Sequence, residues 1–269
     1  MSDPLSPQTE KARNTWNAPG GRYDDISRTI ADAIEHAVER LEPRPGERVL
    51  DLATGTGWAS RCIARRFPEV HISGLDIADR LLAHARQLAE REQLAIAYGV
   101  GNAESLPLED ATLDAVVSTF GVMFASQPER AASELGRVVK PGGRVVLATW
   151  AEDGNVAVMF GILRRFMPTP PAGPSPFAWG RPDRMRELLG ASFELDFEPG
   201  INCFRYPSGE SAWNFWREHY GPIQSLAAAL DEPRRAELAQ AMISWHESFA
   251  SPLGYEQPRR YWIARGVRR

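Results

Sequence analysis

Residues 49–57 read Val-Leu-Asp-Leu-Ala-Thr-Gly-Thr-Gly, a short apolar run that leads into a loop with two glycines. Such a run, bounded by turn residues, predicts a buried strand at 48–53. The residues that follow predict a helix at 58–66, which Pro68 closes. Glycines let the backbone turn tightly and come close to a ligand. This stretch therefore predicts a strand, a ligand-binding loop and a helix in succession.

The rest of the first half alternates in the same way. Further strands are predicted at 70–75, 95–100, 113–119 and 143–149, and helices at about 25–41, 78–93 and 128–139. Alternation of this kind is typical of a Rossmann-like α/β fold, with a doubly wound, mostly parallel sheet covered on both faces. Ligands of such sheets bind beyond the carboxyl ends of the strands. We therefore expect the functional residues just after the strands.

The pattern changes after Trp150. A proline-rich stretch at 168–176 predicts a stiff loop. Helices are predicted at 181–189, 209–219 and 233–249, strand-like stretches at 193–206 with a break at Pro199-Gly200, and a final strand at 260–266. The last two helices are rich in aromatic residues, so we expect them to form a lid over the sheet edge.

Asp76 ends the second predicted strand, 19 residues after Gly57. A carboxylate there can accept both hydroxyls of a ribose, and each charge-assisted bond contributes roughly 1.5–3 kcal/mol. Dinucleotide-binding proteins also place an acid about 20 residues after the glycine loop. Here Ser60 stands at the third glycine position, and no Gly-Lys-Ser/Thr follows the loop. The loop and the acid alone leave the class of nucleotide open.

Five segments together resemble, in order, the motifs of class I S-adenosylmethionine (SAM)-dependent methyltransferases. The segments are residues 49–57, 74–76, 101–108, 113–120 and 138–144, and the resemblance covers roughly residues 47–150. It implies a seven-stranded sheet whose last strand is antiparallel, with an inserted helical lid. It also implies SAM as cofactor and S-adenosylhomocysteine as product.

The resemblance also implies roles for individual residues. The first loop faces the methionine part of SAM, Asp76 takes the ribose hydroxyls, and residues 102–104 read the adenine edge. Asn102 stands where many relatives have aspartate, and an amide can still accept from and donate to the adenine edge. The predicted cofactor-binding residues are Tyr23, Asp51, Ala53, Gly55, Thr56, Gly57, Asp76, Ile77, Asn102, Ala103, Glu104 and Phe120.

Several of these residues have a structural alternative. The glycine loop can be an ordinary tight turn, and Asp76 can cap the next helix while also binding a ribose. Tyr23 resembles a tyrosine that covers the methionine part of SAM in many relatives. Tyr23 and Trp16 can equally pack on the sheet edge as plain core residues. We expect residues 140–143 to form only a turn.

Candidate catalytic residues are His219 and His246, which lie beside aromatic residues on the predicted lid helices. A histidine can deprotonate a hydroxyl or an amine near neutral pH. Packing between aromatic rings is the simpler role for both. Methyl transfer needs a base only when the acceptor must lose a proton, so positioning alone can supply much of the acceleration. The aromatic residues of the lid suit an apolar or aromatic acceptor.

Composition restricts the partners. The net charge of −4 and the pI near 5.8 give no basic field for nucleic acid. Cys62 and Cys203 form no metal-spacing motif, so we expect no metal and a reduced, cytoplasmic protein. No apolar run approaches the roughly 18 residues of a membrane helix, so we expect no membrane insertion. The expected partner is a small-molecule acceptor, and the expected state is a monomer or homodimer.

The sequence thus predicts three parts. These are a flexible N-terminal flap at 1–25, a SAM-binding core at 26–150, and residues 151–269 with the remaining sheet elements and the acceptor-binding lid. The predicted function is SAM-dependent methylation of a hydroxyl, an amine or a carbon of a small molecule. Two alternatives stay open, namely an NAD-dependent oxidoreductase and a non-catalytic binding protein with the SAM fold.

Overall fold

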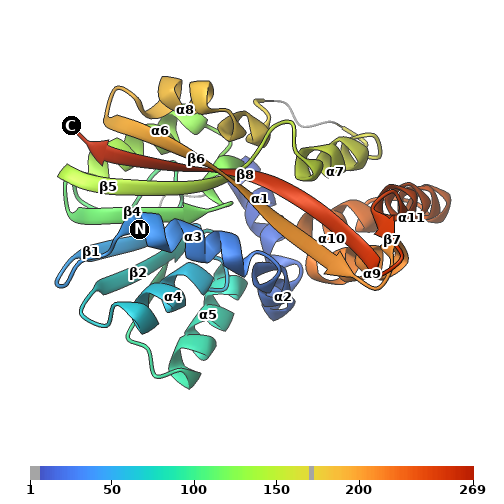
Figure 1. The fold of residues 1–269 in the computed structure, drawn as a ribbon, viewed down its shortest axis with the longest axis horizontal. Helices are drawn as coiled ribbons and strands as arrows, with labels where there is room; N and C mark the ends of the chain where they lie inside the picture. The colour runs from blue at the N-terminus through green and yellow to red at the C-terminus, as the bar shows by residue number, and fades with distance from the viewer. Residues whose placement is uncertain (1–6, 170–172) are drawn as a thin grey trace.

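The computed structural model describes residues 7–169 and 173–269, and parts of the predicted flap and of the predicted proline-rich loop lie outside these ranges. One sheet runs through the molecule in the order β3-β2-β1-β4-β5-β8-β6, with β7 paired to β8 (Figure 1). The strands are β1 Arg48–Leu52, β2 His71–Asp76, β3 Ala97–Val100, β4 Leu113–Thr119, β5 Val139–Trp150, β6 Phe193–Tyr206, β7 Ala250–Ser251 and β8 Gly254–Arg268.

The strand order creates a crevice in the middle of the sheet. β1 pairs in parallel with β2 on one side and with β4 on the other, so the loops after β1 and β4 diverge. Ligands of open α/β sheets bind at such a point. β8 is antiparallel to both β5 and β6. The predicted Rossmann-like fold and its antiparallel last strand are confirmed, and the short β7 is an addition.

Helices cover both faces of the sheet (Figure 1). α3 Ala31–Leu41, α4 Trp58–Arg66 and α5 Asp79–Arg91 lie on one face, and α6 Pro128–Val138 and α8 Pro182–Leu189 lie on the other. The sequence explains this arrangement, because each helix is amphipathic. On α3, for example, one face is fully buried against the sheet and consists of Ala33, Ile34, Ala37, Val38 and Leu41.

The helix predicted at 25–41 is two helices, so that prediction is wrong. α2 Tyr23–Arg28 ends at a turn in which Thr29 donates through its backbone N–H and its hydroxyl to the Ile26 carbonyl, at 3.0 and 2.8 Å. α3 then begins at Ala31. Before them, α1 Pro7–Asn17 and the short 3₁₀ helix η1 Gly20–Arg22 carry the chain over the crevice.

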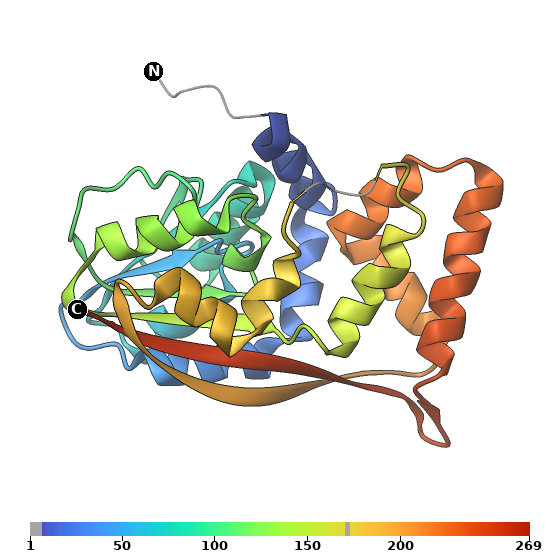
Figure 2. The same cartoon turned by 90° about the horizontal axis from the view of Figure 1, so that it is seen from above.

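β6 and β8 extend well past the rest of the sheet (Figure 2). Their pairing runs as far as Tyr206 opposite Tyr255, whereas β5 leaves β8 at Trp150 opposite Tyr261. We call residues 201–206 and 254–260 the β6–β8 arm. The predicted break at Pro199-Gly200 is wrong, because β6 is an edge strand and tolerates a proline whose missing N–H faces no partner.

The arm ends in a group of helices that the sequence located only in part. α9 Gly209–His219 and α11 Glu232–Glu247 match predicted helices, whereas α10 Gly221–Ala228 between them was not predicted. α7 Asn155–Arg164 follows β5 and packs against β8 and α11, and the 3₁₀ helix η3 Pro176–Gly180 leads on to α8. Figure 1 shows the group of α9, α10 and α11 at the far end of the arm. Within residues 7–169 and 173–269, no helix is long and apolar enough to cross a membrane.

Residues 140–143, predicted to form a turn, lie inside β5, where the pairing with β4 is irregular. The register against β4 shifts between the pairs Leu113–Val139 and Ala115–Arg144. Gly142 has a φ of 75°, a conformation that favours glycine. The prediction that these residues form only a turn is therefore wrong, because they belong to β5, where the backbone bulges.

Candidate functional site

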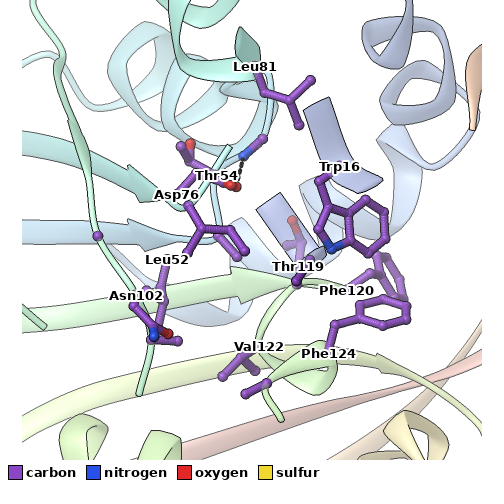
Figure 3. A pocket seen from close by; sticks show the side chains of 18 of the residues that line it. Trp16, Leu52, Thr54, Asp76, Leu81, Asn102, Thr119, Phe120, Val122 and Phe124 are labelled. Carbon is purple, nitrogen blue, oxygen red and sulfur yellow. Dashed lines mark hydrogen bonds between the residues drawn. The ribbon is translucent and has the colours of Figure 1, made fainter. Parts of the chain in front are cut away.

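A cavity lies beyond the carboxyl ends of β1, β2 and β4, under α1 (Figure 3). Every residue that lines it lies between Gln8 and Ser126. The helices α9, α10 and α11, which we call the lid helices after the predicted lid, therefore contribute no residue to the described lining. Its lining includes the loops after these strands, the face of α1 with Trp16, and the short 3₁₀ helix η2 Val122–Phe124. Figure 3 shows two different ends, with Asp76 and Asn102 at one and Trp16, Phe120 and Phe124 gathered at the other.

Asp76 is the central polar residue of the cavity. Its Oδ2 accepts from the Gly55 N–H at 2.8 Å, and its Oδ1 accepts from the Ala78 N–H at 2.8 Å. Burial raises the pKa of this carboxyl, and the backbone N–H groups oppose that rise. Gly55 and Gly57 have φ values of 57° and 82°, so the loop needs glycine at both positions. Asp76 thus holds the glycine loop and the backbone at Ala78, directly before α5.

Asp51 lies behind the loop rather than in the cavity wall. Its Oδ2 accepts from the Thr54 hydroxyl at 2.5 Å and from the Ser60 N–H at 2.9 Å. Burial raises the pKa of the Asp51 carboxyl to about 6. Thr56 and Gly57 are likewise absent from the cavity lining. These three predicted cofactor-binding residues therefore shape the loop from behind.

The loop after β3 brings residues 101–104 to the cavity. The Asn102 Oδ1 accepts from the Glu104 N–H at 3.0 Å, which closes a tight turn. The Glu104 carboxylate accepts from the N–H groups of Ser126 and Gln127 at 2.6 and 3.0 Å, so it anchors the loop that precedes α6. Asn102, Ala103 and Glu104 all line the cavity, together with Ala53, Gly55, Ile77, Phe120 and Tyr23 of the predicted set.

Aromatic rings form the other end of the cavity. The ring of Trp16 lies edge-on to Phe124 at 5.0 Å and to Tyr23 at 6.0 Å between centroids. Phe120 stacks on Trp150 at 3.9 Å, and its φ of 57° turns the chain sharply at the end of β4. Among the described residues that line the cavity, none is lysine, arginine or histidine.

The segment that covers the cavity is tied to the core and to the lid helices. The Asn17 amide donates to Asp79 at 2.8 Å and accepts from the Arg80 N–H at 3.0 Å. Asp24 accepts from the Trp58 indole at 2.7 Å. On the lid side, a Cβ on Gly221 would come within 2.1 Å of the Thr15 carbonyl oxygen, so α10 touches α1 closely. Figure 2 shows α1 between the sheet and the lid helices.

Neither candidate catalytic histidine lines the cavity. His219 stacks on Phe215 at 4.5 Å, and its Nδ1 lies 2.8 Å from the Phe215 carbonyl oxygen. His246 is fully buried in the lid, with its Nδ1 2.9 Å from the Tyr255 hydroxyl. Burial lowers the pKa of His246 to about 4. The structure places both histidines in lid packing, and we assign neither a step.

Several residues that line the cavity were not predicted from the sequence. Thr119 ends β4 and Phe124 follows it, so the rule that functional residues lie at the carboxyl ends of strands points to both. Ser27 comes from α2, Ile34 from α3 and Ile30 from the turn between them, and Gln8 and Ala12 come from α1. The sequence of α1 carries no motif that reveals its place over the crevice.

Comparison with known proteins identifies the family. Residues 50–147 match the family described as a methyltransferase domain. Rv1403c of Mycobacterium tuberculosis is 31% identical over 205 residues, which cover 75% of this chain and 74% of that protein. The ubiquinone/menaquinone biosynthesis C-methyltransferase UbiE of Ruegeria sp. is 33% identical over 159 residues, covering 55% of this chain and 64% of that protein.

Solved structures share the fold. The YcgJ protein of Bacillus subtilis has a TM-score of 0.63 and 17% identity, with 88% of this chain and 98% of that chain covered. Phosphoethanolamine N-methyltransferase 2 of Haemonchus contortus, in complex with S-adenosylhomocysteine, has a TM-score of 0.57 and 18% identity, with 88% and 52% covered. The fold is that of a Rossmann-like methyltransferase. The chain belongs to the class I SAM-dependent methyltransferases.

Proposed function

We propose that this protein transfers the methyl group of SAM to a small, uncharged, apolar or aromatic molecule. The proposal rests on the two different ends of one cavity. Asp76 and Asn102 lie at its polar end, and Trp16 and Phe124 lie at its aromatic end. The polar end fits a nucleoside, and the aromatic end fits a flat apolar body beside it.

The residues at the polar end fit SAM. Asp76 is a buried carboxylate at the rim of a glycine loop, and it holds the ribose hydroxyls. Ile77 packs on the adenine, and Asn102 bonds to its edge. Among the described lining residues, the charged side chains are the carboxylates of Asp76 and Glu104, which suit the positive sulfur and ammonium groups of SAM. When bound there, SAM supplies a methyl group on a positively charged sulfur.

The aromatic end selects the acceptor. A phosphate or a carboxylate needs a cationic partner when it is buried, and the described lining offers none. Trp16 and Phe124 instead offer apolar faces to a flat ring. The relative UbiE and the demethylmenaquinone methyltransferase of Deinococcus radiodurans, which is 39% identical over 132 residues, are named for quinone substrates, and this supports an apolar acceptor.

The chain contributes to catalysis mainly by positioning and by excluding water. Holding the acceptor atom in line with the methyl group can supply about 7–11 kcal/mol of the barrier in well-oriented reactions. Phe120 and Trp16 close the space around the acceptor, and α1 covers it. No histidine in the described lining serves as a base, so the acceptor atom is one that needs little help in losing a proton.

A panel of acceptors tests this proposal. The purified protein is incubated with SAM and with matched compounds: naphthols and demethylated quinols as uncharged acceptors, and phosphoethanolamine and hydroxybenzoate as anionic ones. S-adenosylhomocysteine is measured by mass spectrometry. We expect turnover with uncharged aromatic compounds only. Faster turnover with the anionic compounds would contradict the proposed acceptor class, and SAM binding without turnover on any compound would favour a non-catalytic role.

A further inference from the structure

Three arginines are buried among residues 7–169 and 173–269, and one of them differs from the other two. Arg61, Arg144 and Arg259 are 5%, 4% and 1% exposed. Arg61 pairs with Glu92 at 2.6 Å, and Arg144 pairs with Glu47 at 2.6 Å. Arg259 forms no ion pair with any described residue, although a buried charge without a counter-charge is costly. The contacts that stabilise the buried charge of Arg259 therefore need to be identified.

The contacts of Arg259 converge on one backbone carbonyl. Its Nη2 donates to the Thr29 carbonyl oxygen at 2.6 Å and lies 3.3 Å from the Thr29 hydroxyl. Its guanidinium lies 4.9 Å from the centre of the Phe204 ring and 5.6 Å from that of Trp150. Burial lowers the pKa of Arg259 to about 10, so the charge is retained at neutral pH. Two aromatic rings and a carbonyl thus contact the guanidinium, and the charge of the nearby Asp32 also favours it, but no carboxylate pairs with it directly.

Asn202 reaches the same carbonyl from the other strand of the arm. Its Nδ2 donates to the Thr29 carbonyl oxygen at 3.0 Å and to Asp32 Oδ1 at 2.5 Å. Asn202 and Arg259 are direct neighbours in the β6–β8 pairing. A carbonyl oxygen has two lone pairs, so the two donors saturate Thr29. We call Thr29 with Asn202 and Arg259 the Thr29 latch.

The latch holds the joint between two helices that wall the cavity. Thr29 lies between α2 and α3. Tyr23 and Ser27 of α2 line the cavity, and so do Ile30, directly before α3, and Ile34 of α3. A shift of the joint therefore moves four cavity-lining residues together. The other end of the arm carries Phe204 and Tyr255, which pack on Trp216 and His246 of the lid helices.

We propose that Arg259 and Asn202 are positioning residues for cofactor binding, because the Thr29 latch fixes α2 and α3 against the cavity. Through the latch, the arm ties the lid helices to the cofactor site. Arginine is suited to this role because its planar guanidinium can bond to the carbonyl while lying against two rings. This inference rests on the proposed use of SAM, which also serves as the probe.

The test compares two buried arginines. Arg259→Met removes the latch, and the control Arg144→Met removes a buried guanidinium that bonds to Leu41 and Glu42 at the far end of α3. The SAM dissociation constant is measured by calorimetry at a temperature where both variants are folded. We expect Arg259→Met to weaken SAM binding about ten-fold, and Arg144→Met to change it less than about two-fold. Arg259→Lys should recover part of the loss.

A second readout does not depend on SAM. Amide hydrogen exchange of residues 23–34 in the protein without ligand should be faster in Arg259→Met than in the wild type, and unchanged in Arg144→Met. If Arg259→Met does not fold, Asn202→Ser replaces it in both measurements. Wild-type SAM affinity and wild-type exchange in the latch variant would overturn the inference, and so would an equal loss in both arginine variants. If the wild type binds no SAM, the proposed function fails, while the exchange experiment still decides the latch.

Discussion

The two ends of the cavity are built by different kinds of contact. At the polar end, neighbouring strand ends and loops hydrogen-bond to one another, as when Asp76 at the end of β2 accepts from the Gly55 N–H of the loop after β1 at 2.8 Å. At the aromatic end, rings from distant parts of the chain meet, as when Trp16 of α1 touches both Phe124 and Tyr220. The polar end is therefore a local property of the core. The aromatic end depends on how α1 and the lid helices pack, so acceptor choice can change while cofactor binding is kept.

The largest expected effect is a loss of SAM affinity when a carboxylate at the polar end of the cavity is replaced, compared with a carboxylate elsewhere in the sheet. Asp76→Ala should weaken SAM binding about a hundred-fold, because two charge-assisted hydrogen bonds are lost. Calorimetric titration with SAM measures this. The control Asp114→Ala removes a carboxylate at the start of β4, where it bonds to Lys140 at 2.6 Å. It should leave SAM affinity unchanged, and an equal loss in both variants would argue against a specific role for Asp76.

The next prediction addresses the aromatic end. Trp16→Ala should raise the KM of an acceptor from the panel about ten-fold, because a buried aromatic contact is lost. The SAM dissociation constant should change less than about three-fold, since the contacts of Asp76 and Asn102 are unaffected. Steady-state kinetics and calorimetry give the two values. A loss of SAM affinity as large as the rise in KM would mean that α1 serves the cofactor instead.

A pH experiment tests the contribution of Asp51, which lies behind the glycine loop and accepts hydrogen bonds from Thr54 and Ser60. The pKa of Asp51 is about 6 in the folded protein and lower in the unfolded chain, so the folded state binds the proton more tightly. This carboxyl therefore contributes stability at low pH that is lost as the pH rises to about 6. Relative to Asp51→Asn, the wild type should gain about 2 kcal/mol in the free energy of unfolding between pH 7 and pH 4.5. Urea unfolding at both pH values measures it, and parallel pH dependences would contradict the prediction.

The smallest expected effect concerns the lid histidines. Losing a general base usually costs roughly 10²- to 10⁴-fold in rate. His219 packs on Phe215 outside the cavity lining, so His219→Ala should change kcat by less than about two-fold. Steady-state assays with an acceptor from the panel check this. A hundred-fold fall in kcat with unchanged stability would restore His219 as a catalytic residue and imply that the lid moves during turnover.

The parts that sequence predicted well are those fixed by local patterns. α4 and β4 have the predicted bounds, and the loop after β1 has the predicted glycine turn, because apolar periodicity and glycine placement act over a few residues. For the same reason Asp76 and Asn102 reach the cavity, since Asp76 ends the parallel strand β2 and Asn102 follows the parallel strand β3.

The parts that sequence missed depend on contacts between distant residues. α2 and α3 separate at Thr29, whose carbonyl is bound by Asn202 and Arg259 from the far end of the chain. β6 continues through Pro199-Gly200 because of its place at the sheet edge. The helix α1 reaches the cavity through packing against α10, where Gly221 meets Thr15. No local pattern encodes any of these three features.

Calorimetric titration of the wild-type protein with SAM, and separately with NAD, tests directly whether SAM is the cofactor that the cavity binds. We predict saturable SAM binding in the micromolar range and no detectable heat of binding with NAD. NAD binding that is tighter than SAM binding, or no SAM binding by the folded protein, would contradict it.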